Sequence, residues 1–276
     1  MPPAGDGGES IIWIGPERFR LGLDRGQALD LRHVLVSGVD LAPGLQAPCQ
    51  PDDLIGRALQ GFMFTCGPDH IRQAAKGMGP GGRNWVWPQH GSLLRAPPCE
   101  VIRHEDGLAT QITICLPCGG RARLCRRWRM NPSRQGVTLT DCLENCGTSD
   151  WAPMIMYHLN FGGGQLTRAT TLMAGRRKTP VPMAMEERHL CLPAPSDRRV
   201  RIAPLASVPA GVEIGFSGLD WLQTWRHRGR HGDVFSVEPA SHDRRPREQL
   251  GPALTTLRPG EGREYRLCLR VPAVLP

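Results

Sequence analysis

A histidine and an asparagine stand two residues apart in the apolar segment 154–163. Alternate side chains of a strand share one face, so His158 and Asn160 would point the same way. Polar groups inside a strand need hydrogen-bonding partners or a chemical task, because burying them unpaired is costly. The simpler interpretation is a buried histidine that bonds only to the backbone. The pattern makes this segment the first candidate for a reactive site.

Groups of related chemistry occur in three other places. Asp69 and His70 follow a Gly-Pro turn, His90 precedes a glycine, and Glu238 precedes a proline in an apolar run. A carboxylate and a histidine suit general acid–base chemistry, since their ordinary pKa values bracket neutral pH. The alternatives are structural: Asp69 and His90 as turn residues, and Glu238 as an exposed carboxylate at a strand end.

Composition limits the classes of protein that fit. The 276 residues carry a net charge of +8, and arginines far outnumber lysines but are scattered. With no recognisable nucleic-acid-reading element, basic charge is poor evidence for such binding, so we expect no nucleic-acid partner. No apolar run approaches the length of a membrane span. The N-terminus lacks the features of a signal peptide. We therefore expect no membrane association, a cytoplasmic protein, and a disordered lead-in at residues 1–9.

Ten cysteines raise the question of a metal site. Cys115 and Cys118 form a CxxC pair, and Cys142 and Cys146 form a looser CxxxC pair. Zinc knuckles use two tight pairs, whereas these pairs lie in strand-like sequence. We expect buried, reduced, structural thiols, no metal site and no cofactor.

Alternation of apolar and polar residues, broken by Gly, Pro, Asp and Ser, dominates the chain and is typical of hairpins. It predicts strands at 11–14, 31–36, 101–104, 110–114, 124–129, 136–143, 200–202, 211–216 and 265–271. Only 52–60, with its acidic start, predicts a short helix. This pattern indicates an all-β protein with a large antiparallel two-sheet β-sandwich, in one domain over residues 10–276.

Four motifs occur in a fixed order: a TCG-x-D turn ending at Asp69, an HG turn at His90, a YH-x-NFG strand through His158, and a late EP strand at Glu238. Together they resemble the aldose 1-epimerase (galactose mutarotase-like) superfamily, most closely a divergent bacterial branch of it. The resemblance spans about residues 10–275. It implies the same large β-sandwich.

The resemblance also implies roles. His158 would be the general acid and Glu238 the general base, while His90 would bind a sugar hydroxyl and help to polarise the ring oxygen. Asn160 would orient His158 or bind substrate.

Three further residues are implied as substrate-binding. Asp69 and His70 would line the same cleft, although His70 departs from the residue expected at its position. Arg226 would lie near Glu238 as a substrate clamp or carboxylate partner. Well-studied mutarotases have an N-R-I segment upstream of the His-Gly motif that supplies a substrate-binding arginine. Residues 63–67 stand roughly there instead, so substrate orientation should differ.

The expected function is that of an aldose 1-epimerase, or mutarotase, which interconverts the α and β anomers of a free sugar. The basic balance permits an acidic sugar. The expected partner is a small carbohydrate, and the chain would be a monomer or homodimer. One alternative is a non-catalytic carbohydrate-binding protein on the same fold. Another is a glycoside-processing enzyme or lyase that uses Glu238 and Asp69 as its two carboxylates.

Overall fold

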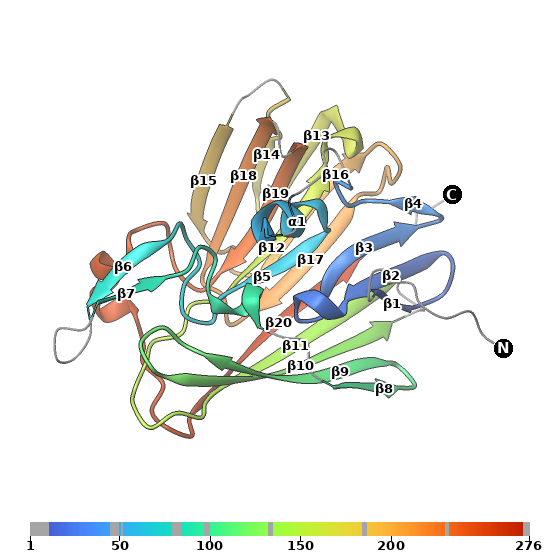
Figure 1. The fold of residues 1–276 in the computed structure, drawn as a ribbon. Coiled ribbons are helices and arrows are strands. Elements are labelled where there is room, and N and C mark those ends of the chain that lie inside the picture. The colour runs from blue at the N-terminus through green and yellow to red at the C-terminus, as the bar shows by residue number, and fades with distance from the viewer. Residues whose placement is uncertain are drawn as a thin grey trace.

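Two nine-stranded antiparallel sheets pack face to face and enclose the main apolar core. The computed structural model describes residues 11–44, 50, 52–78, 84–96, 100–131, 135–183, 187–229 and 232–272. The expected lead-in at residues 1–9 lies outside this part. The architecture confirms the predicted all-β, antiparallel two-sheet sandwich (Figure 1).

The first sheet carries the residues singled out above. Its strands, in spatial order, are β1 (Ile11–Ile14), β2 (Phe19–Asp24), β3 (Asp30–Val36), β5 (Met63–Cys66), β12 (Met156–Gly162), β19 (Gly232–Ala240), β18 (Trp221–Gly229) and β15 (Glu187–Pro193), with β4 (Val39–Asp40) paired to β3.

The second sheet forms the opposite layer. Its order is β14 (Arg177–Pro180), β13 (Leu166–Ala174), β16 (Arg199–Leu205), β17 (Val212–Ser217), β20 (Gly262–Arg270), β11 (Gly136–Asn145), β10 (Arg121–Asn131), β9 (Gly107–Cys115) and β8 (Val101–His104). A separate hairpin, β6 (Ala75–Met78) and β7 (Asn84–Trp87), projects to the left in Figure 1.

Helices are short. The described ones are α1 (Leu54–Gln60), α2 (Arg247–Leu250) and the 3₁₀ turns η1 (Arg25–Gln27), η3 (Ser92–Arg95), η5 (Gly163–Gln165) and η6 (Gly251–Ala253). The predicted helix is confirmed: Asp53 caps α1 by accepting a hydrogen bond from the Gly56 amide at 2.8 Å. Within the described residues, no helix is long and apolar enough to cross a membrane.

A second, smaller apolar cluster covers the outer face of the first sheet. Phe64 and Met156 contribute to it from β5 and β12, and Ala58 and Leu59 contribute from α1. Because side chains alternate along a strand, the intervening Met63 and Tyr157 face the inter-sheet core instead. The first sheet is therefore covered on both faces, which lets it hold polar groups out of bulk water on its outer side.

The inter-sheet core contains one charged side chain on β10, at a position where the alternating pattern calls for an apolar residue. Arg126 is fully buried and forms ion pairs with Asp30 at 2.6 Å and Asp141 at 2.7 Å. Tyr157 donates to Asp141 at 2.9 Å, and Arg126 donates to the Thr65 hydroxyl at 2.7 Å. These groups, the Arg126 network, link both sheets through satisfied hydrogen bonds.

The prediction of buried thiols is wrong for most of the described cysteines. They form no disulfides, and Cys66 is buried. Cys115, Cys125, Cys142 and Cys268 are exposed instead. The reason is register: these four side chains fall on the solvent-facing side of the second sheet, where alternation points them away from the core.

Candidate active site

A cavity of about 450 Å³ opens on the outer face of the first sheet. Its floor comes from the central strands β12, β19 and β18, and its walls come from α1, the segments after β5 and β19, and β15. The lining residues are Ile55, Leu59, Ile71, Arg72, Gln73, Gln89, His90, Met156, His158, Glu187, His189, Gln223, Trp225, His227, Glu238 and Arg244.

His158 and Glu238 meet on the floor of this cavity. Nε2 of His158 lies 3.2 Å from Oε1 of Glu238, and both side chains are about 95% buried, with 5% and 4% of their surface exposed. They come from neighbouring antiparallel strands, β12 and β19, which pair directly. The Ser236 hydroxyl also donates a hydrogen bond to Oε1 of Glu238. A histidine and a carboxylate, 80 residues apart in sequence, thus share one partly enclosed site.

Asn160 fixes the orientation of His158. Its Oδ1 lies 2.7 Å from Nδ1 of His158, while its amide nitrogen donates to the Gly61 carbonyl at 2.9 Å. Because those donors must point at a carbonyl, the Asn160 oxygen faces the ring and Nδ1 carries a hydrogen. Nε2 then faces Glu238, where two lone pairs would repel each other. A hydrogen bond across this 3.2 Å contact requires one proton between the two atoms, so His158 and Glu238 are placed to donate and accept a proton.

Aromatic contacts hold the imidazole from its faces. The Phe64 ring stacks on His158 with centroids 4.5 Å apart, and Trp225 meets it edge-on at 5.8 Å. Trp225 also stacks on His227 at 4.9 Å and on His189 at 6.3 Å. These rings form an amphipathic wall of the kind that suits the apolar face of a sugar.

His90 reaches the cavity from the HG turn. Its φ of +57° is left-handed, and its N–H donates to the Arg72 carbonyl at 2.8 Å. Burial, together with the charges of His158, His70 and Arg72, lowers the pKa of His90 from 6.5 to about 3. The ring therefore stays neutral. Nδ1 lies 3.3 Å from the Cys66 thiol, and burial raises the pKa of that thiol well above 9.0.

Asp69 joins two turns of the chain and does not line the cavity. Its two carboxylate oxygens accept from the Ser92 amide at 2.8 Å and the Ser92 hydroxyl at 2.7 Å. The turn that holds Asp69 is thereby fastened to the turn that holds His90. Gly91 lies between them with a φ of +87°, and a Cβ there would come within 2.4 Å of the Gly67 carbonyl oxygen. Only glycine permits this close approach of two turns.

His70 also points away from the cavity lining. Its Nε2 lies 2.7 Å from the Gln73 carbonyl oxygen, and only 1% of its surface is exposed. Burial lowers its pKa below 6.5. Asp69 and His70 therefore support the wall that carries His90. Glu238 lines the cavity but Asp69 does not, so the glycoside-processing alternative lacks its second carboxylate there.

Arg226 does not lie beside Glu238, contrary to the expected position. The residue opposite Glu238 on β18 is Gln223, whereas Arg226 is opposite Phe235. Arg226 follows Trp225 directly and so faces the other side of the sheet. There it pairs with Asp233 and donates to the Val234 carbonyl at 3.0 Å.

Two arginines that the sequence patterns did not single out line the cavity instead. Arg72 donates from Nη1 to the Gln223 side chain at 3.4 Å and from Nη2 to the Asp243 carbonyl. Arg244 donates to Nδ1 of His189 at 2.8 Å. Arg72 lies upstream of the His-Gly motif, as does the substrate arginine of the resembled family, but outside any recognisable motif.

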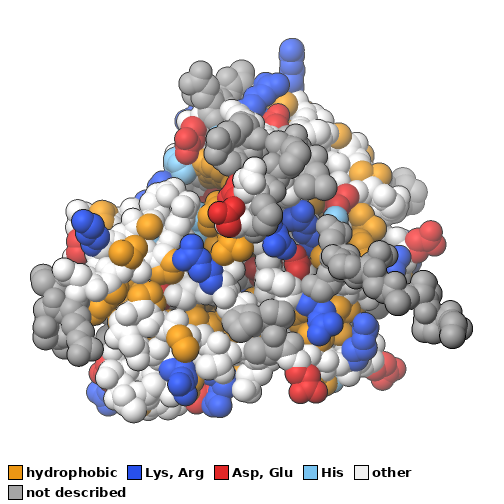
Figure 2. All heavy atoms as spheres, viewed as in Figure 1, with side chains coloured by type: hydrophobic (Ala, Val, Ile, Leu, Met, Phe, Trp, Pro, Cys, Tyr) orange, Lys and Arg blue, Asp and Glu red, His pale blue; other side chains and the backbone are white. Residues whose placement is uncertain are grey.

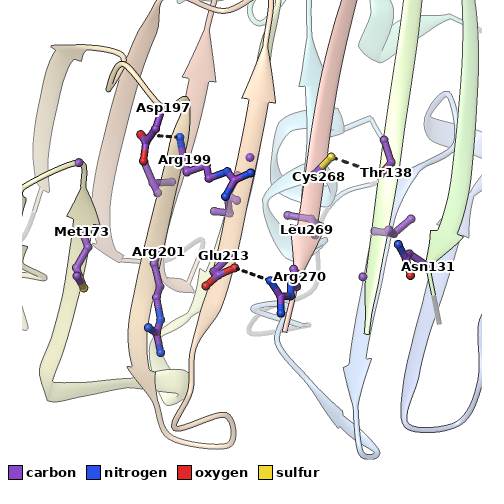
Figure 3. Close-up of a pocket in the computed structure, with 16 residues that line it drawn as sticks. Asn131, Thr138, Met173, Asp197, Arg199, Arg201, Glu213, Cys268, Leu269 and Arg270 are labelled. Carbon is purple, nitrogen blue, oxygen red and sulfur yellow. Dashed lines mark hydrogen bonds and ion pairs between the residues drawn. The ribbon is translucent and has the colours of Figure 1, made fainter. Parts of the chain in front are cut away.

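Another hollow, of about 430 Å³, lies on the solvent face of the second sheet and is drawn in Figure 3. Exposed strand residues line it, including Arg199 and Met173, and Glu213 pairs there with Arg270 at 3.7 Å. No histidine is among the described residues that line it. It lacks the acid–base chemistry of the first cavity.

Metal-ligating side chains do not cluster among the described residues: no group of three or more His, Cys, Asp or Glu could hold an ion there. Cys115 is exposed and Cys118 half-buried, and both are free thiols. On the face shown in Figure 2, the described Lys and Arg side chains are spread among apolar and acidic ones.

Comparison with solved structures identifies the fold. A candidate aldose 1-epimerase from Escherichia coli K12 superposes with a TM-score of 0.74 at 16% identity, over 97% of this chain and 100% of that one. A galactose mutarotase-like protein from Lactobacillus casei ATCC 334 gives 0.70 at 12% identity, over 95% and 99%. An aldose epimerase homologue from C. elegans gives 0.65 at 12% identity, over 95% and 98%.

No family model matches the chain, and no curated protein matches it in sequence. The structural matches span almost the full length on both sides, so the chain has the galactose mutarotase-like β-sandwich fold. That outcome agrees with the resemblance seen in the four motifs.

Proposed function

We propose that the protein is an aldose 1-epimerase that interconverts the α and β anomers of a free sugar. The observation that carries this proposal is the contact of His158 with Glu238 on the floor of a cavity, with Asn160 fixing the imidazole. A proton-sharing pair of this kind is what ring opening of a hemiacetal needs. The fold neighbours bear names from the same enzyme class.

In the proposed reaction, Glu238 removes the proton of the anomeric hydroxyl and His158 protonates the ring oxygen. The C1–O5 bond breaks, C1 becomes an aldehyde, and rotation about C1–C2 exposes its other face. The O5 hydroxyl then attacks C1, with the proton returned to His158 and Glu238 protonating the new anomeric oxygen. Protons balance over the cycle, and both groups return to their starting states.

Neighbouring groups suit this reaction. A neutral His90 can hydrogen-bond to a sugar hydroxyl without competing for protons, because its pKa is lowered to about 3. The stacked Trp225 offers an apolar surface to the sugar ring. The cavity has room for a monosaccharide, since about 450 Å³ lies within the usual range of small-molecule sites.

The test is magnetisation exchange between α and β anomeric protons, measured by NMR across a panel of neutral and acidic aldoses. We expect accelerated exchange for at least one sugar. Glu238→Gln and His158→Ala should each lower kcat by about 10²–10⁴-fold, the usual contribution of a general acid or base. Sugar binding without acceleration would favour a non-catalytic carbohydrate-binding protein, and cleavage of a glycoside would favour a glycoside-processing enzyme.

A further inference from the structure

Two guanidinium groups stand on one wall of the cavity without a carboxylate partner. Arg72 follows β5 and Arg244 follows β19, so different parts of the chain bring them together. Arg72 donates to an amide oxygen of Gln223 and to the main-chain carbonyl of Asp243. Both acceptors are neutral. Within the described part of the chain, neither arginine lies at ion-pair distance from an acidic side chain.

The acidic groups nearby are already engaged. Asp243 pairs through its carboxylate with Arg245 at 2.8 Å. Glu187 accepts from Trp225 at 3.0 Å and lies 3.0 Å from Nε2 of His189. Glu238 contacts His158. None of the three neutralises the two cavity arginines by direct contact.

Leaving these cations unpaired has a cost. Burial and the charge of Arg244 together lower the pKa of Arg72 to about 10, against the raising effect of the more distant Glu238 and Asp243 carboxylates. The two positive charges are thus close enough to repel each other. Nε of Arg72 is also buried without a hydrogen-bond partner. An anion between Arg72 and Arg244 would accept from these donors and offset the repulsion.

Among the described residues, Arg244 is held in place by a relay that uses only one of its donors. It donates to Nδ1 of His189, which requires the neutral ring to carry its hydrogen on Nε2, and that nitrogen faces Glu187. One of the five Arg244 N–H groups is used in this way. The planar guanidinium keeps an edge that can bind a carboxylate, phosphate or sulfonate.

We propose that Arg72 and Arg244 form an anion subsite, and that the substrate is an aldose with an anionic group remote from C1. This inference rests on the proposed epimerase function, because it places the charged group in the cavity that holds His158 and Glu238. A sugar 1-phosphate is excluded, since the reaction needs a free anomeric hydroxyl. The anion is a carboxylate, phosphate or sulfonate on the far side of the ring.

The experiment compares matched sugars: glucose, glucuronate, glucose 6-phosphate and a 6-sulfonated glucose, each assayed by NMR anomeric exchange. We expect kcat/KM to be at least about tenfold higher for one of the anionic sugars than for glucose. Arg72→Gln and Arg244→Gln should lower kcat/KM for that sugar by about 10–100-fold and for glucose by less than about threefold. Which anionic sugar is preferred identifies the group.

Arg188→Gln is the matched control. Arg188 lies on β15 beside His189, but its side chain lines the hollow around Arg226 on the other face of the sheet. The substitution removes the same charge from β15, the strand that carries the Arg244 partner His189, and should leave the preference for anionic sugars intact. An equal loss in Arg188→Gln would overturn the assignment to Arg72 and Arg244.

Two outcomes separate this inference from the proposed function. If glucose and its anionic relatives are accelerated equally, the anion subsite is wrong and the epimerase stands. If no sugar is accelerated, calorimetric titration with inorganic phosphate decides the subsite separately: binding weakened in Arg72→Gln supports it, and absent or unaltered binding overturns it.

Discussion

Tyr157 and His158 are adjacent on strand β12 and point to opposite faces of the sheet. They differ in whether the charged groups around them are fully paired. Tyr157 points into the inter-sheet core and joins the Arg126 network, while His158 points outward to the cavity. In the network, the donors of Arg126 meet Asp30, Asp141 and neutral oxygens within 2.9 Å.

The electrostatics of the network follow from that completeness. Burial lowers the pKa of Arg126, but the charges of Asp141 and Asp30 outweigh it and raise the pKa above its ordinary value. Its charge is fixed at every accessible pH. In the cavity, by contrast, His158 meets Glu238 beside open space, and no described carboxylate lies at ion-pair distance from Arg72 or Arg244. A fully paired group holds the sheets together, whereas an incompletely paired one is available to bind and react.

The largest expected effect breaks the network. Arg126→Met removes the cation and leaves Asp30 and Asp141 buried without it, which should lower the free energy of unfolding by about 3–5 kcal/mol. Urea denaturation followed by circular dichroism measures this. Glu238→Gln, in the cavity, keeps the shape and a hydrogen-bonding group and should cost less than about 1.5 kcal/mol of stability, the net contribution of one hydrogen bond, while abolishing most activity. Similar losses of stability in both variants would contradict the view that the Arg126 network stabilises the fold while the cavity pair serves the reaction.

The next effect tests how the imidazole of His158 is oriented in the cavity. Asn160→Ala removes the acceptor for Nδ1 of His158 and should lower kcat by about 10–100-fold, as for other residues that orient a functional histidine. KM should change by less than about threefold, because Asn160 bonds to His158 and the Gly61 carbonyl and does not line the cavity. A rise in KM with kcat unchanged would make Asn160 a substrate ligand instead.

Arg226 offers a control for the arginine assignments. Arg226→Met frees Asp233 and several carbonyls from their donor, which should lower the free energy of unfolding by about 1–3 kcal/mol. Its side chain faces away from the cavity, so kcat/KM of the folded enzyme should stay within about threefold. Loss of activity without loss of stability would instead indicate that Arg226 acts in the active site.

The smallest effect concerns pH. The pKa of His90 is about 3 in the folded protein and near 6.5 in the unfolded chain, so between these values only the unfolded chain binds the proton. Stability from this residue is therefore present above about pH 6.5 and is lost as the pH falls toward 3. His90→Asn, which tolerates the left-handed backbone, should reduce the drop in urea midpoint between about pH 7.5 and pH 4.5. The exposed His104→Asn should leave that drop unaltered.

Much of the fold could be predicted because alternation is a local signal. The strands at 101–104 and 11–14 have the predicted bounds, and β12 displays His158 and Asn160 on one face as alternation requires. Eight strands were missed: β2, β5, β6, β7, β13, β14, β15 and β18. In β18, for example, buried Gln223 and Arg226 interrupt any clean apolar pattern.

The site was harder to predict because it depends on register. The family resemblance implied that Arg226 should lie near Glu238, but the pairing of β18 with β19 sets Gln223 there. Arg72 and Arg244 belong to connecting segments without periodicity, and only the packing of those segments brings them to one wall. The sequence around a turn residue such as Asp69 looks the same whether its carboxylate binds a ligand or joins two turns. Its role could therefore not be predicted from the sequence.

The back-to-back arrangement on β12 also limits how this chain can diverge. Losing or gaining one residue between Met156 and Asn160 would exchange the faces, turning the imidazole into the core and the phenol into the cavity. A single insertion or deletion of this kind would destroy both the Arg126 network between the sheets and the pair of His158 and Glu238. Length changes should therefore be tolerated in the connecting loops and excluded from this strand, whereas point substitutions can act on one face at a time.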